Sequence, residues 1–191
     1  MASVLDIYNR ALQKLGVKAL TSVSDNSVAA RACNVCYETL RDSETIKHRW
    51  SHAIKRASLA ADATPPAWGR TNSFAVPSDY LRLIPPYPEM DSPYRDWVVE
   101  NRKILTNDSA PLALRYIGQI TDPNQMDVTF REALSAKMAW EMCEELTQSN
   151  SKQASAKEDY REAIKEARKT SAIQNVPQDA VEDTWISVRS Q

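Results

Sequence analysis

The chain opens with two stretches in which apolar residues recur every three or four positions. Ser3 begins a capping-box pattern and Gly16 stands where a glycine commonly ends a helix, so the spacing predicts a short amphipathic helix over residues 3 to 15. Further on, the N-capping residues 25 to 27 precede a longer apolar row that ends near Trp50. The sequence therefore predicts two helices at the start of the chain.

The middle of the chain has a different pattern. Most of the 10 prolines stand between residues 51 and 120, beside short runs of alternating apolar and polar residues, so helices cannot run far there. Asn101-Arg102 is a plausible tight turn, although Asn-Gly is a stronger hairpin signal. The pattern predicts a small antiparallel β region with strands at 53–60, 80–84, 97–100 paired with 103–106, and 112–117.

Helical spacing returns in the last third of the chain. A long helix is predicted from Thr121-Asp122-Pro123 to Leu146, and its apolar residues form two faces, so it must be packed on two sides. After a polar turn, a fourth helix carries a narrow seam of mostly small residues and ends near Ala172. The fold class that follows is α+β by segregation, with two helices before the β region and two after it.

This pattern divides the chain into three parts. Residues 1–50 and 121–172 are predicted to form a four-helix bundle, residues 51–120 an inserted β region, and residues 173–191 an extended C-terminal arm. The arm is polar except for an apolar group, and aromatic anchors among polar residues are typical of interfaces. We therefore predict a partner-binding site in the arm at Trp185, Ile186 and Val188.

Composition and charge exclude several classes of protein. The 191 residues carry 24 Lys and Arg against 25 Asp and Glu, so the net charge of −1 lacks the basic excess of a free-standing DNA-binding protein. No apolar run is long enough to span a membrane, and the first residues do not resemble a signal peptide. We expect a protein that is made in the cytosol and has no membrane partner.

Three cysteines and two histidines are the candidates for redox or metal chemistry. Cys33 and Cys36 have the C-x-x-C spacing, but only Cys143 remains as a third thiol, and a redox pair usually follows a strand. His48 and His52 are four residues apart without the H-E-x-x-H pattern, which favours surface or boundary histidines. We predict no metal and no cofactor, and we interpret the cysteines as small hydrophobic packing residues.

No catalytic motif stands out elsewhere. Nucleophile-elbow, P-loop and dinucleotide-binding patterns are absent from the sequence, and paired acidic residues lie on predicted solvated helix faces. We predict that the protein is not an enzyme. Core or interface packing, instead of nucleic-acid stacking, is the interpretation for the five tryptophans, Trp50, Trp68, Trp97, Trp140 and Trp185.

Several segments together resemble one known family. In order along the chain they are Ala11–Gly16, Leu20–Ala30, Tyr37–Asp42 leading to Trp50, Val76–Leu83, Tyr116, Thr121–Asn124 and Phe130–Ala136. No single segment is specific, but the ordered set resembles the head-to-tail adaptor, or tubular tail protein A, family of short-tailed phages. The resemblance covers most of the chain.

The resemblance implies a structural protein of the virion neck, made in the host cytoplasm. Adaptors of this family assemble into a ring, typically a dodecamer, between the portal protein and the tail nozzle or tail tube protein. The helices form the ring body, the β part faces the tail, and genome DNA passes through the lumen. A near-neutral charge suits this role, because a strongly basic channel would bind the DNA.

Two other functions stay open at this point. The chain could be a small α+β protein-binding or regulatory module in which the long helix forms a partner groove. It could also be an enzyme that uses the thiols of Cys33 and Cys36. The gene neighbourhood separates the first alternative from the adaptor, because an adaptor gene stands beside portal, capsid and tail genes.

Overall fold

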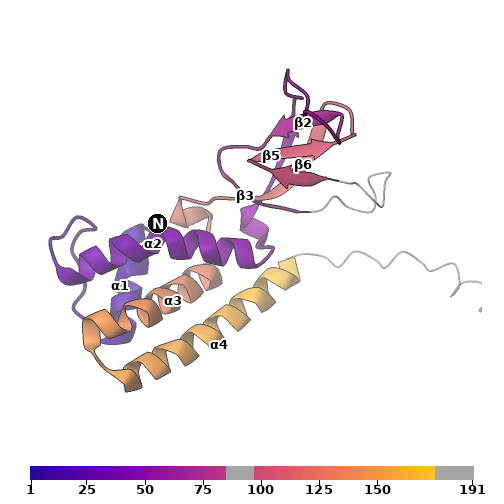
Figure 1. Ribbon diagram of the computed structural model, residues 1–191. Helices are drawn as coiled ribbons and strands as arrows, with labels where there is room; N and C mark the ends of the chain where they lie inside the picture. The colour runs from indigo at the N-terminus through magenta and orange to yellow at the C-terminus, as the bar shows by residue number, and fades with distance from the viewer. Residues whose placement is uncertain (85–96, 175–191) are drawn as a thin grey trace, which may run out of the picture.

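The computed structural model of the protein describes residues 1–84 and 97–174. Within these ranges it is an α+β protein with four α-helices and two small antiparallel sheets. Figure 1 shows the helices gathered in one body and the strands in a second body beside it. The chain enters the β body after helix α2 and returns from it before helix α3. The α+β class predicted from the sequence is confirmed.

The two N-terminal helices form where their caps predict. Helix α1 (Val4–Leu15) has Ser3 as its N-cap in a complete capping box, and it ends at Gly16, whose φ of 70° is left-handed. Helix α2 (Val28–Lys47) begins after Ser27, whose side chain accepts a hydrogen bond from the Ala30 backbone N–H. Both predicted helices are confirmed.

Helix α3 (Val128–Thr147) begins later than the sequence pattern suggests. We expected it to start at Thr121-Asp122-Pro123, but those residues lead into a single 3₁₀ turn, η2 (Pro123–Gln125). The Asp122 side chain caps this turn by accepting a hydrogen bond from the Asn124 backbone N–H, at 2.9 Å. Met126 is then extended and buried, so Asp122 and Pro123 begin the short turn instead of the long helix.

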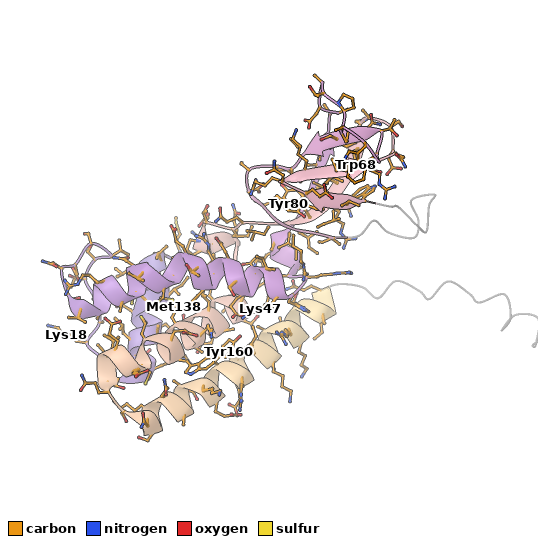
Figure 2. The ribbon with its side chains drawn as sticks, viewed as in Figure 1. Lys18, Lys47, Trp68, Tyr80, Met138 and Tyr160 are labelled. Atoms are coloured by element: carbon orange, nitrogen blue, oxygen red, sulfur yellow. The ribbon has the colours of Figure 1, made fainter. Side chains whose placement is uncertain are left out.

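The third helix lies at the centre of the helical body. It contacts α1, α2 and α4 (Asn150–Gln174), which agrees with the prediction that it is packed on more than one side. Its buried residues include Phe130, Leu134 and Met138, each no more than 1% exposed. Figure 2 shows Met138 among the helices. Helix α4 buries most of its predicted seam of small residues, and its described part reaches Gln174, beyond the predicted limit at Ala172.

The β body consists of two three-stranded antiparallel sheets. Sheet A has the order β1-β6-β3, and sheet B has the order β2-β5-β4. The expected hairpin is confirmed as β4–β5, and Asn101 and Arg102 both have positive φ, at 45° and 58°, as a tight two-residue turn requires. The bounds are β1 (Ile54–Leu59), β2 (Asn72–Ala75), β3 (Tyr80–Leu83), β4 (Val98–Glu100), β5 (Lys103–Thr106) and β6 (Leu112–Gly118).

Strand β2 was not predicted. It has only four residues and one large apolar side chain, Phe74, so it shows no alternation that a sequence pattern could detect. It forms because its backbone pairs with β5 and Phe74 is completely buried between the sheets. Long-range pairing therefore decides the structure of this segment.

Two hydrophobic cores share sheet A. One face of the sheet packs on sheet B, and the core between them contains Phe74, Ile104, Leu112, Leu114 and Tyr116. At the helix-proximal end of its other face, Ile84 and Ile117 are buried in the core of the helical body, and Ile54 and Leu81 pack against it. Sheet A is therefore a wall common to both bodies.

Some predictions concern residues that the structure does not describe. Residues 85–96 and the predicted arm from residue 175 onward, with Trp185, Ile186 and Val188, lie outside the described residues. None of the helices in residues 1–84 and 97–174 is long and apolar enough to cross a bilayer.

Candidate functional site

The cysteines of the C-x-x-C pair lie on α2, and their side chains are largely buried. Cys33 is completely buried on α2, and the Cys36 thiol donates to the Cys33 backbone carbonyl, at 3.5 Å. Burial raises the pKa of Cys33 and that of Cys36, which reaches about 11. A thiol reacts as its thiolate, so both groups are poorly suited to redox or nucleophilic chemistry at neutral pH. Cys143 is buried beside Thr147.

The histidines lie at the joint between the two bodies. His48 is half-buried and its ring lies 4.8 Å from the Trp50 ring, centroid to centroid. The side chain of His52 is only 6% exposed, and its Nδ1 is 3.0 Å from a carboxylate oxygen of Asp127. The boundary interpretation holds, but His52 is not a surface residue. Residues 1–84 and 97–174 contain no group of three His, Cys, Asp or Glu side chains that could hold a metal ion.

The joint is built around Trp50. This residue is 1% exposed, its indole N–H donates to the Glu44 carbonyl at 2.9 Å, and its ring packs at 4.9 Å on Phe130 of α3. The next residue, Ser51, begins the 3₁₀ turn η1 (Ser51–Ala53) that leads into β1. The Ser51 backbone N–H donates to Ser171 near the end of α4. These contacts join the start of the β body to α2, α3 and α4 at one point.

A buried carboxylate links α2 to α4 below this joint. Glu44 is 1% exposed and accepts hydrogen bonds from the Tyr160 hydroxyl, at 3.0 Å, and from Lys47, at 2.6 Å. Burial, and then the Glu44 charge, raise the pKa of Tyr160 to about 12. Figure 2 labels Lys47 at the end of α2 and Tyr160 on α4. The satisfied carboxylate is a structural contact because its hydrogen-bonding capacity is used within the fold.

A second polar contact joins α1 to α3. Glu132 accepts from Arg10 and from Lys14, each at 2.8 Å, and these bonds hold its pKa at about 2. A shallow groove of about 410 Å³ runs beside this contact, and it is lined mainly by the first turns of the two helices. Val128 lies on its rim and is 70% exposed. Charged side chains of both helices, among them Asp6, Arg10 and Glu132, line the groove.

One large aromatic side chain projects into solvent from the β body. Trp68 is 87% exposed and precedes Gly69, whose φ of 91° is left-handed, in the segment between β1 and β2. The end of this segment is fixed, because Thr71 donates to the Asn107 side chain from both its backbone N–H and its hydroxyl. Figure 2 places Trp68 in the β body, away from the helices.

The tryptophans therefore have different roles. Trp50 is a core residue, and Trp140 is half-buried with its ring stacked at 5.8 Å on Tyr160. The Trp97 indole N–H donates to Asp108. Trp68 does not belong to either core, so the interface role remains a prediction for it, as it does for Trp185.

Sequence comparisons add no relative to this description. No known family model matches the chain, and no curated protein is similar to it.

Proposed function

We propose that the protein is a head-to-tail adaptor subunit of a tailed phage, which assembles into a ring between the portal and the tail. The observation that carries this proposal is the ordered set of segments that resembles the adaptor family. The division into a helical body and a β body supports it, because both bodies occur in the order that the resemblance implies. In this proposal the subunit is structural, and genome DNA passes through the ring.

In this proposal the four helices act as the ring-forming bundle and the β body faces the tail. Large apolar side chains exposed on both bodies are consistent with subunit and tail contacts: Val35 is 81% exposed on α2, Val128 70% on α3, and Trp68 87% in the β body. The arm with Trp185 would bind the portal or the neighbouring subunit. The thiol enzyme is the weakest alternative, because burial raises the pKa of both cysteines of the C-x-x-C pair.

The proposal is tested by assembly with a portal protein encoded beside this gene. We expect the purified protein to be mostly monomeric by light scattering and to form rings in negative-stain images once portal is added. Antibody labelling of purified virions should place it at the neck. A protein that stays monomeric with portal and is absent from virions would instead favour the small binding or regulatory module. Stable rings without portal would show that no template is needed.

A tail-side variant adds a control for this experiment. Trp68→Ser changes an exposed side chain of the β body and leaves the helical body untouched. We expect this variant to form rings on the portal as the wild type does, but to attach less tightly to the tail protein below. Loss of ring formation in this variant would show that the β body, and not the helical body, makes the subunit contacts.

A further inference from the structure

The face of sheet A turned away from sheet B carries arginines. On β6, Leu112, Leu114 and Tyr116 lie in the core between the sheets, so Arg115 points to the opposite face, because side chains alternate along a strand. Arg56 of β1 pairs directly with Arg115. Its neighbour Ala57 packs on the core between the sheets, which places Arg56 on the same outer face as Arg115.

The third strand of the sheet adds another arginine to this face. Leu83 of β3 packs on the core between the sheets, whereas the next residue, Ile84, is buried in the helical core, so the residues on both sides of Leu83 face outward from sheet B. Arg82 is therefore on the outer face, opposite Ile117. Each of the three strands of sheet A contributes one arginine to the same face.

Two more arginines belong to the helical body and lie close to the joint. Arg49 follows the end of α2, directly before the joint, and Arg168 precedes Ser171 by one helical turn on α4. Ser171 accepts a hydrogen bond from the Ser51 backbone N–H at 3.4 Å, so the last turns of α4 lie beside η1, which leads into β1. Burial, followed by the positive charges of Arg168, Arg82 and Arg49, lowers the pKa of His48.

The carboxylate described at the joint, Asp127, pairs with His52 and not with these arginines. Arg49, Arg56, Arg82 and Arg168 form no ion pair with any carboxylate of residues 1–84 and 97–174, and the outward-facing positions of the three strands hold no Asp or Glu. Arg49, Arg56 and Arg168 are exposed, and Arg82 is half-buried. Grouped like charges repel one another, so an anionic ligand stabilises such a surface.

We propose that this arginine face, formed by Arg49, Arg56, Arg82 and Arg168, contacts the phosphate backbone of double-stranded DNA. The planar guanidinium group fits phosphate oxygens with two parallel hydrogen bonds. The remaining outward positions next to Arg56 and Arg115 are the small residues Ser58 and Ala113, which allow a backbone to approach closely. The aromatic rings of sheet A, Tyr80 and Tyr116, pack on the opposite face, so this one offers no stacking platform for single strands.

The contact is independent of base sequence and weak. Four phosphate contacts give a slope of about −3.6 for the logarithm of affinity against the logarithm of salt concentration. Weak, salt-sensitive contacts let DNA move past a subunit, so they are compatible with a conduit. The inference goes beyond the proposed function and does not rest on it, because a single subunit carries the whole face.

The test is fluorescence anisotropy of a short labelled DNA duplex with the full-length protein. We expect the affinity of the wild type to fall about 100-fold when salt rises from about 50 to about 200 mM. The variant R56Q/R82Q/R168Q should bind at least about tenfold more weakly at the lower salt, with a slope near −1. The matched control K18Q/R31Q/R161Q removes the same number of charges from other surfaces and should keep most of the wild-type slope.

Circular dichroism melting of all three proteins checks that each is folded. The proposal is overturned if the wild type shows no binding at the lower salt, or if both variants lose affinity equally, since net charge alone would then explain the effect. It is also overturned if poly-glutamate displaces the duplex at equal charge concentration, because the face would then fit an acidic protein. None of these outcomes bears on ring formation, which is measured with portal.

Discussion

Removing the charge of Glu132 tests how much its ion pairs stabilise the packing of α1 against α3. It accepts hydrogen bonds from Arg10 and Lys14 of α1, and these bonds hold its pKa at about 2 against the ordinary 4.5. The substitution Glu132→Gln keeps the size of the side chain and one carbonyl oxygen but removes the charge. We expect this variant to fold and to be less stable at neutral pH, because the Arg10 and Lys14 cations lose their common partner.

The shift in the pKa of Glu132 sets an upper limit on the free energy that this carboxylate contributes to folding. A carboxyl whose pKa falls from 4.5 to about 2 on folding would contribute at most about 3 kcal/mol. The side chain is 38% exposed, so solvent screening reduces the expected value to about 1 kcal/mol. A loss of that size lowers the melting temperature of a chain of this length by about 2 to 4 °C.

The direction of the pKa shift determines how the stabilisation by Glu132 changes with pH. Because the folded-state pKa lies below the unfolded-state value, the unfolded chain binds more protons between pH 4.5 and about 2, and the contribution is fully present above pH 4.5. The difference between wild type and Glu132→Gln should therefore be largest at pH 7 and shrink as the pH falls toward 2. Urea unfolding at several pH values measures it.

A matched control separates this contact from general surface charge. Glu158 pairs with Arg161 on α4 at 3.1 Å, and both side chains are 60% exposed. Glu158→Gln should change the free energy of unfolding by less than about 0.5 kcal/mol. Equal effects of the two substitutions, or a Glu132 effect that does not depend on pH, would refute the reasoning.

Three further predictions concern the cysteines, the exposed tryptophan and the C-terminal arm. Elemental analysis should find no stoichiometric zinc after dialysis; zinc that is retained by the wild type and lost in C33S/C36S would contradict this. Trp68→Ala should change the free energy of unfolding by less than about 0.5 kcal/mol, because the side chain is 87% exposed, and a large loss in urea unfolding would show that it packs in the fold. Deleting residues 176–191, or making Trp185→Ala, should leave the melting temperature nearly unchanged and weaken attachment to the portal or to the neighbouring subunit. Infectious particles assembled normally from the truncated protein would rule out the binding role of the arm.

Local signals in the sequence were sufficient to predict most of the helices. Ser3 and Gly16 delimit α1 because a capping side chain and a left-handed glycine act within one turn. The two-faced apolar pattern of α3 likewise identified the central helix. The start of that helix was missed because the cap at Asp122 is used by a separate 3₁₀ turn, and the competition between the two starts depends on the burial of Met126.

The joint and the arginine face depend on contacts that are distant in sequence. His52 gave no local sign that it would be buried against Asp127, which lies 75 residues further along the chain. The arginines of sheet A are separated along the chain, and only the pairing register brings Arg56 opposite Arg115. The near-zero net charge concealed this grouping, because a sum over the chain contains no information about position. The exposure of Trp68 could not be predicted either, because a tryptophan in a sequence indicates burial at least as strongly as exposure.

The shared wall between the two cores has a mechanical consequence. A β body that is joined to a helical body only by a linker can change its orientation without disturbing the helical core. Sheet A cannot reorient in this way, because Ile84 and Ile117 are buried in the helical core while Leu114 and Tyr116 are buried in the β core. Tilting the β body would therefore open the apolar contacts that Ile84 and Ile117 make in the helical core.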